Sequence, residues 1–255
     1  MSTLILRSSG SAAPPVESGS LAFAGGASTA NSPTVRMLRT GAMDFDTATI
    51  EFFFRVSAND ADNNQEIAPG ANYNLTDSNI IADGDSVGTR GYIIGLSAGM
   101  LCFGINTSGG ARTVQGTTDV RDFVWRHAYT YRNGATMRIG LDGVREVNFT
   151  TAPTGLITYD GDSPATDQYL YWCKEKLNAT FGCDCEIGPI RISSNERYAG
   201  ATYTVPTEPF TDDANTIAFW NGDDGSGSQL SDGSGNGHHG TLLGSPLPTW
   251  GAGPF

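Results

Sequence analysis

The sequence predicts an all-β protein, a two-sheet antiparallel β-sandwich, and three observations support this fold class. Thirty-three glycines and twelve prolines interrupt the 255 residues at short intervals, which is typical of many short strands joined by turns. Runs rich in aromatic and β-branched residues recur between these breaks, as strands require. Helical periodicity is almost absent. The length suits one large β domain, because such sandwiches often run to roughly 200 to 250 residues without splitting.

Each expected strand follows from its local sequence. Residues 49–56 are dense in aromatic side chains and predict a central strand. The apolar runs 91–96 and 100–105 flank a short turn that ends in glycine and predict a hairpin. Residues 125–144 contain an Asn-Gly and an Asp-Gly pair, which tolerate positive φ, and predict a meander of three strands. Further strands are expected at 21–23, 168–173, 187–192 and 217–220.

One extended segment predicts how the sandwich closes. Residues 197–210, termed the strap below, follow a β-branched strand and contain Pro206 and Pro209. Proline fixes φ and lacks an N–H, so this segment is held extended without joining a ladder. We expect the strap to tie one sheet to the other before the next apolar strand begins.

The domain organisation follows from composition. Residues 1–20 are small and proline-bearing and predict an N-terminal arm or linker, and 21–255 form the sandwich domain. Within it, residues 57–90 hold few large apolar side chains. A polar stretch of this length predicts an insertion that offers a contact surface.

Charge and the N-terminal sequence exclude several classes of partner. The net charge is −12, with 15 Lys and Arg scattered along the chain, so we expect no nucleic acid, which needs concentrated positive charge. The start has no basic region and only a short apolar run, so neither a signal peptide nor a membrane span is expected. Four cysteines are too few for a disulfide scaffold and suit buried thiols in a reducing cytoplasm.

The residues of known catalytic motifs argue against an enzyme. Retaining polysaccharide hydrolases place paired carboxylates about 5 Å apart, and those sharing this kind of sandwich use the motif E-x-D-x-x-E. No two of the eight glutamates here lie within five positions of each other. Ser97 lies in a G-x-S-x-G string, but a second strand rather than a helix is expected to follow it, unlike a nucleophile elbow. His127 is expected to be structural, whereas His238 and His239 are expected to face solvent.

Two candidate binding sites remain. Aromatic ring faces stack on pyranose faces, and four aromatic residues near an acidic loop form a candidate carbohydrate platform, with core packing as the alternative: Tyr159, Tyr169, Tyr171 and Trp172. The loop from Asp232 through Asn236 reproduces the start of an oxygen-lined calcium loop. It lacks the glutamate of the twelfth loop position, so a calcium site would need Asp223 or Asp224 as well. The alternative for this loop is a simple Asx turn.

Three stretches resemble the concanavalin A-like or laminin-G-like jelly-roll domain. They are the strand 49–56, the meander 125–144 with Trp125 and His127, and the strand 187–192. The segment 220–242 is similar to the opening strand and loop of that family, although here it comes last. This order and the motif Y-T-x-P-T-x-P-F-x-x-D-A-N-T at residues 203–216 resemble laminin-G-like domains of tailed-phage structural proteins.

The resemblance implies a virion structural protein of a bacteriophage, either a capsid decoration protein or a tail or fibre component. It would assemble in the host cytoplasm, dock on other virion proteins through the N-terminal arm, and display a lectin-like domain, with homo-oligomers as a further expectation. A carbohydrate-binding module for glycans of the host surface is the alternative. A divergent polysaccharide-degrading enzyme is the third reading, against which the carboxylate pattern speaks.

Overall fold

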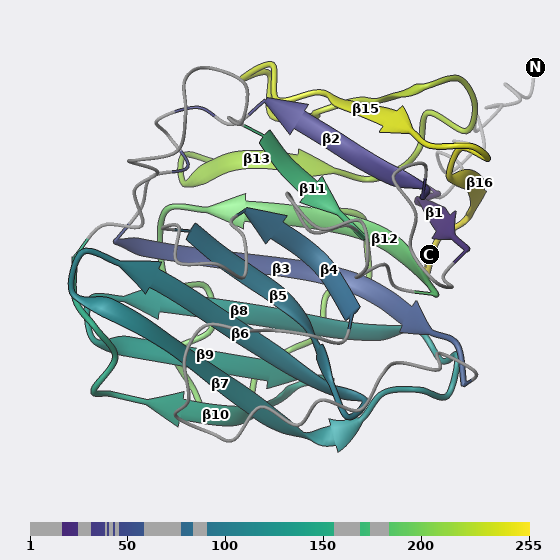
Figure 1. Ribbon diagram of the computed structural model, residues 1–255. Coiled ribbons are helices and arrows are strands. Elements are labelled where there is room, and N and C mark those ends of the chain that lie inside the picture. The colour runs from purple at the N-terminus through teal and green to yellow at the C-terminus, as the bar shows by residue number, and fades with distance from the viewer. Residues whose placement is uncertain are drawn as a thin grey trace, which may run out of the picture.

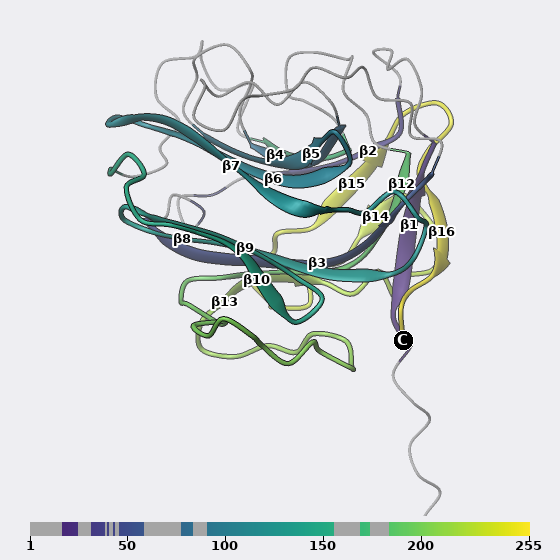
Figure 2. The same ribbon diagram turned by 90° about the horizontal axis from the view of Figure 1, so that it is seen from below.

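The computed structural model describes two β-sheets that pack face to face (Figures 1 and 2). It covers residues 17–24, 32–38, 40, 43, 46–58, 78–83, 91–155, 169–173 and 184–255, with the backbone alone for 78–83. All named elements in these ranges are strands, and none of the described residues belongs to a helix long and apolar enough to cross a membrane. The predicted antiparallel β-sandwich is confirmed.

Sheet A contains eight strands. Seven follow one another in the order β10 (Val144–Phe149), β9 (Thr136–Leu141), β8 (Arg126–Asn133), β3 (Thr47–Val56), β12 (Cys185–Ser193), β1 (Gly19–Phe23) and β16 (Thr249–Ala252). The eighth, β13 (Thr216–Trp220), pairs with β12 beside this path. Every pairing is antiparallel. The long strand β3 pairs with β12 on one side and with β8 on the other.

Sheet B also contains eight strands. Their order is β14 (Gln229–Leu230), β15 (Gly240–Leu243), β2 (Thr34–Leu38), β11 (Tyr169–Trp172), β4 (Ser78–Asp83), β5 (Gly91–Ser97), β6 (Met100–Thr107) and β7 (Gly110–Asp119). The short strands β14 and β15 come from the C-terminal glycine-rich segment and pair beside β2. The segment that resembles a family's opening strand and loop therefore contributes to both sheets.

The predicted hairpins form where the turn residues demand them. The β5–β6 turn has φ of 50° at Ala98 and 79° at Gly99, and the β9–β10 turn has 46° at Asp142 and 88° at Gly143. Positive φ at both central residues matches the right-handed twist of the flanking strands. Ser97 is therefore a buried hairpin residue rather than the nucleophile of an elbow.

Several strands were not expected from the sequence. They include β2, β4, β7 and β16, whereas β8, β9 and β10 are the three strands of the expected meander. Strand β4 falls inside the predicted polar insertion 57–90, so that range is not one uninterrupted loop; residues 59–77 and 84–90 lie outside the described residues. Residues 1–16 of the predicted arm also lie outside them, and β1 already begins at Gly19.

The core lies between the sheets and follows from alternation along the strands. On β3, Ile50, Phe52 and Phe54 point into the core, whereas Glu51 and Phe53 point to the opposite face of sheet A. Each fully buried Ile or Phe of this kind stabilises the fold by roughly 1.5 to 3 kcal/mol relative to exposure. Trp172 of sheet B meets Trp220 of sheet A edge to face, with ring centroids 5.6 Å apart. The two sheets thus meet through aromatic rings.

The strap crosses the outer face of sheet A, away from sheet B (Figure 2). The Tyr203 N–H donates to Gly143 O at 2.8 Å, and the Arg145 N–H donates to Ala201 O at 2.9 Å. The strands before and after the strap, β12 and β13, both belong to sheet A. The expectation that it ties one sheet to the other was wrong, because the extended segment lies across one sheet and returns to it.

Candidate functional site

A buried carboxylate fastens the upstream part of the strap to sheet A. Glu51 on β3 is fully buried on the outer face. Its Oε1 accepts a hydrogen bond from Arg191 Nε at 2.7 Å, and its Oε2 accepts one from the Tyr198 hydroxyl of the strap. His127 Nε2 lies 3.6 Å from Oε2. Burial raises the pKa of Glu51, but the neighbouring His127, the charge of Arg191 and these hydrogen bonds outweigh burial and hold its pKa below the usual value.

Arg197 forms a second fastening at the start of the strap. Its two terminal nitrogens donate to both carboxylate oxygens of Asp213, at 2.7 and 2.9 Å, and its Nε donates to Ser193 Oγ at 2.6 Å. The hydrogen bonds from Arg197 hold the pKa of Asp213 well below its usual range. A bidentate pair of this kind fixes orientation as well as charge, so the strap leaves β12 in one direction.

His127 and Tyr203 complete this region. His127 Nδ1 lies 3.0 Å from the Tyr203 hydroxyl, and the two rings pack with centroids 5.4 Å apart. His127 is 1% exposed and lies between β3 and the strap. It packs as the predicted structural histidine. In this part of the outer face, the His127 ring packs against the rings of Tyr198 and Tyr203 from the strap.

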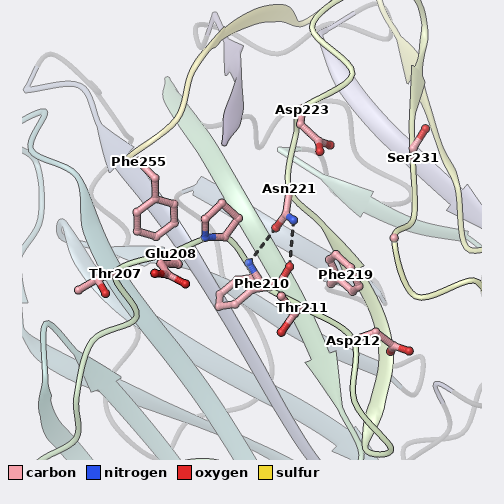
Figure 3. A pocket seen from close by; sticks show the side chains of 12 residues that line it. Thr207, Glu208, Phe210, Thr211, Asp212, Phe219, Asn221, Asp223, Ser231 and Phe255 are labelled. Atoms are coloured by element: carbon pink, nitrogen blue, oxygen red, sulfur yellow. Dashed lines mark hydrogen bonds between the residues drawn. The ribbon is translucent and has the colours of Figure 1, made fainter. Parts of the chain in front are cut away.

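A pocket opens at the downstream end of the strap (Figure 3). Its volume is about 930 Å³, within the range of small-molecule sites. The strap and the residues after it form one wall, β13 and the following loop form another, and Phe255 approaches from the C-terminal end (Figure 3). Its lining comprises Thr207, Glu208, Pro209, Phe210, Thr211, Asp212, Phe219, Asn221, Asp223, Ser231, Gly233 and Phe255.

The apolar side of the pocket is an aromatic cluster. Phe53, Phe210 and Phe219 form a small buried cluster on the outer face, and Phe255 packs against it half-buried. The ring centroid of Phe53 is 4.9 Å from that of Phe255 and 6.0 Å from that of Phe210. Phe53 is therefore the base on which two of the lining rings rest.

Two contacts hold the walls in place. The Asn221 side chain accepts from the Phe210 N–H and donates to Phe210 O, both at 3.0 Å (Figure 3). Gly233 is needed on the other side, because a Cβ there would lie 2.4 Å from the Phe219 ring. The pocket is thus pre-formed by a side chain that mimics a backbone pairing and by a close approach that only glycine allows.

The rim of the pocket is polar and acidic. Glu208, Asp212 and Asp223 are exposed carboxylates, and Thr207 and Thr211 add exposed hydroxyl groups. The twelve lining residues include no Lys, Arg or His. An aromatic floor with a hydrogen-bonding rim can hold a ligand that has both apolar faces and hydroxyl groups.

The predicted carbohydrate platform is not one surface. Trp172 is 1% exposed and packs in the core, so it is not available to a ligand. This part of the prediction was wrong because successive side chains of β11 point to opposite faces of the sheet. Tyr169 and Tyr171 lie half-buried on the other side of β11, with ring centroids 6.4 Å apart. The Arg36 guanidinium lies 4.3 Å from the Tyr169 ring centroid. Tyr159 lies outside the described residues.

The predicted calcium ligands make other contacts. Asp232 is 7% exposed, and its two oxygens accept from the N–H groups of Phe219, Ser234 and His238 and from the Ser234 hydroxyl. Burial raises the pKa of Asp232, but these hydrogen bonds outweigh it and lower the pKa. This geometry is the Asx-turn alternative.

The other predicted calcium ligands also make contacts of their own with the protein or line the pocket. Asp224 accepts from the Ser231 N–H at 2.8 Å, Asn236 donates to Ile217 O at 2.9 Å, and Asp223 lines the pocket. In the described part of the chain, no three His, Cys, Asp or Glu side chains gather as a metal site requires. Calcium binding stays a prediction, and the described residues do not gather the ligands that it requires. His238, expected in solvent, is buried, and its carbonyl accepts from Trp220 Nε1 at 2.8 Å.

Comparison with known proteins bears on the fold. No protein-family model matches the chain, and no curated protein matches it either. Among solved structures, a Bacteroides ovatus protein provisionally described as carbohydrate binding aligns with a TM-score of 0.58 and 13% identity over 94% of this chain and 61% of that chain. The LG1-3 region of the laminin α2 chain aligns with a TM-score of 0.50 and 13% identity over 88% and 38%.

These similarities show the fold alone. The chain has a concanavalin A-like jelly-roll fold, as the sequence motifs imply. It spans about three fifths of the length of the first of these matched chains. The resemblance to phage structural proteins stays a prediction.

Proposed function

We propose that this protein is a non-catalytic carbohydrate-binding protein and that the outer-face pocket is its ligand site. The observation that carries the proposal is the combination of three lining phenylalanine rings with a rim of hydroxyl and carboxylate groups. Aromatic faces stack against the apolar faces of pyranose rings, and the rim can hydrogen-bond sugar hydroxyls. The similarity to the Bacteroides ovatus protein supports the same reading.

The absence of catalysis is part of the proposal. The fully buried glutamate of the outer face, Glu51, has a lowered pKa and is held by Arg191, so it is unsuited to donate a proton as a general acid. The E-x-D-x-x-E motif of retaining polysaccharide hydrolases with this kind of sandwich does not occur in the sequence. We expect no reducing sugar to be released from any polysaccharide that the protein binds. Release of sugar at enzymatic rates would overturn this part.

The test is a glycan array followed by calorimetric titration of the best oligosaccharide. Phe255→Ala removes a half-buried lining ring, and an aromatic stacking partner is worth about 1 kcal/mol, so we expect roughly five-fold weaker binding. Tyr171→Ala is the matched control, because it removes a half-buried ring on sheet B. We expect it to bind like the unmodified protein. The reverse pattern would move the ligand site to sheet B.

The sequence supports a second candidate function. We propose that the domain acts as a structural component of a phage particle, docked on virion proteins. Residues 203–216, which carry the resemblance to phage proteins, form part of the strap and its continuation, and they include wall residues of the pocket such as Phe210. Glycan binding and virion assembly are compatible, since a displayed lectin-like domain could serve both.

The virion proposal is tested on purified particles. Deletion of residues 1–16 removes most of the predicted arm but leaves β1, which begins at Gly19. We expect the shortened protein to fold and to be missing from particles, as measured by mass spectrometry. Normal occupancy would contradict docking through the arm, and absence of the full-length protein from particles would contradict the virion role itself.

A further inference from the structure

We infer that the pocket prefers sugars with a protonated amino group over neutral and anionic sugars. This inference rests on the proposed carbohydrate-binding function and names the class of ligand. It follows from the charges around the pocket, from the positions of the nearest cations, and from the aromatic rings that line it.

The charges that face the pocket have one sign. Glu208 lies on the strap, Asp212 just after it, and Asp223 on the loop beyond β13, so carboxylates approach from two walls. No basic side chain is among the lining residues. The whole chain carries a net charge of −12, which adds a long-range field of the same sign. An anionic sugar such as a uronate would meet repulsion from both walls.

Two arginines beside the pocket wall, Arg191 and Arg197, are paired with other carboxylates. Arg191 donates to Glu51, and its guanidinium carbon lies 4.7 Å from the Phe210 ring centroid. Arg197 is held by Asp213 through two hydrogen bonds. Arg191 also donates to the Thr211 carbonyl at 3.4 Å, beside the rim. Neither side chain is part of the lining, and within the described residues neither forms an ion pair with Glu208, Asp212 or Asp223.

The aromatic lining is suited to a cation as well as to a sugar face. A cation within about 6 Å of a ring centroid is attracted by the negative face of the ring. Arg191 already uses one such contact with Phe210, and Phe255 offers a half-buried ring at the pocket wall. An ammonium group on a pyranose would thus meet carboxylates and ring faces together, while Thr207 and Thr211 are placed to bond its hydroxyls.

The experiment compares three oligosaccharides by calorimetric titration at pH 6. The probes are a glucosamine trimer with free amines, its fully N-acetylated counterpart and a galacturonate trimer. Exposed ion pairs each strengthen binding only a few-fold, so three carboxylates together predict roughly tenfold tighter binding of the free-amine trimer than of the N-acetylated trimer. The difference should shrink as salt is raised from about 0.05 to 0.5 M. The galacturonate trimer should bind weakest.

Charge-neutral variants locate the effect. Asp223→Asn and Glu208→Gln should each reduce the preference for the free amine roughly two- to five-fold, with little effect on the N-acetylated trimer. Asp119→Asn is the control, because this exposed carboxylate lies at the end of β7 on sheet B. It makes the same charge change away from the pocket and should leave the preference unchanged. An equal effect of Asp119→Asn would assign the preference to net charge and overturn the inference.

The outcomes separate the inference from the function beneath it. Equal binding of the free-amine and N-acetylated trimers, or tighter binding of galacturonate, would overturn the ammonium preference and leave carbohydrate binding intact. Failure of every sugar on the array to bind would overturn the proposed function as well. Choline serves as a non-sugar ammonium probe. If it binds as tightly as the glucosamine trimer, the pocket recognises ammonium alone, and the assignment to amino sugars is wrong.

Discussion

The upstream and downstream ends of the strap lie on the same face of sheet A, yet they are built in opposite ways. At the upstream end, Tyr198 and Arg197 contact the fully buried carboxylate of Glu51. At the downstream end, the strap instead forms the wall of a pocket in which Phe210 is its innermost ring. One end is a fastening, and the other is open to a ligand.

Two adjacent aspartates just after the strap contribute one to each of these two regions. Asp213 is bound through both oxygens by Arg197, whereas Asp212, its neighbour, lines the pocket and makes no ion pair within the described part of the chain. A carboxylate that is already satisfied by protein groups contributes to stability. A carboxylate that faces open space is available to a ligand. The difference shows that the charge of a carboxylate does not by itself indicate its role here. The role depends on whether another side chain of the protein already pairs with that carboxylate.

The largest effect is expected from removing the upstream fastening. Glu51→Ala leaves Arg191 and Arg197 without their buried partner, and breaking a buried ion pair costs about 3 to 5 kcal/mol. Urea unfolding followed by fluorescence should show this loss of unfolding free energy. Glu186→Ala is the matched control, because its pair with Arg55 is more exposed, and about 1 kcal/mol is expected. Equal losses would show that the Glu51 cluster is not the main anchor.

A change at the downstream end is expected to lower the unfolding free energy less than Glu51→Ala does, and to weaken sugar binding as well. Asn221→Ala removes both hydrogen bonds to the Phe210 backbone, and unpaired buried groups cost about 1 to 3 kcal/mol. Because the wall is released, sugar affinity should also fall, as measured by calorimetry. Glu51→Ala, assayed at a temperature where it is folded, should retain more affinity than Asn221→Ala. The opposite order would erase the contrast between the two ends.

Much of the sandwich was predictable because its strands carry local signals. Positive φ at Ala98 and Gly99 lies where the sequence predicts a hairpin turn. Strand β7 was not predicted because its sequence, Gly110–Asp119, has few apolar residues. It is held by its antiparallel ladder with β6 and by contacts with sheet A, where Glu146 of β10 accepts from the N–H of Thr117 at 3.0 Å and from the hydroxyl of Thr118. Pairing of this kind leaves no pattern in the strand itself.

The candidate site was less predictable for the same reason. Its three rings come from the strap, from β13 and from the last residues of the chain, and no local pattern brings such segments together. One signal was available in the alternation of 51–54. Since Phe52 and Phe54 face the core, Glu51 and Phe53 must face outward, and an outward Phe beside a Glu in a central strand indicates a covering segment. The same alternation separates Trp172 from Tyr171 on β11.

The smallest effect is expected in the response of stability to acid. The pKa of Asp213 is lowered chiefly by the hydrogen bonds from Arg197, and its unfolded value is near 4. A group whose pKa is depressed by folding adds stability above the unfolded pKa and loses it as pH falls through the folded value. The protein should therefore lose stability below about pH 4, where Glu51, whose pKa is also lowered, acts in the same direction.

Asp213→Asn should lower the urea midpoint at pH 7 and reduce the further drop between pH 7 and pH 3, because the variant has no carboxylate to protonate at that position. The change is expected to be modest, since the Asp213 side chain is 42% exposed and solvent screens the pair. Asp212→Asn makes the same substitution one residue away, on the pocket side, and should leave the drop unchanged. If the two variants respond alike, the boundary between fastening and pocket does not lie between these residues.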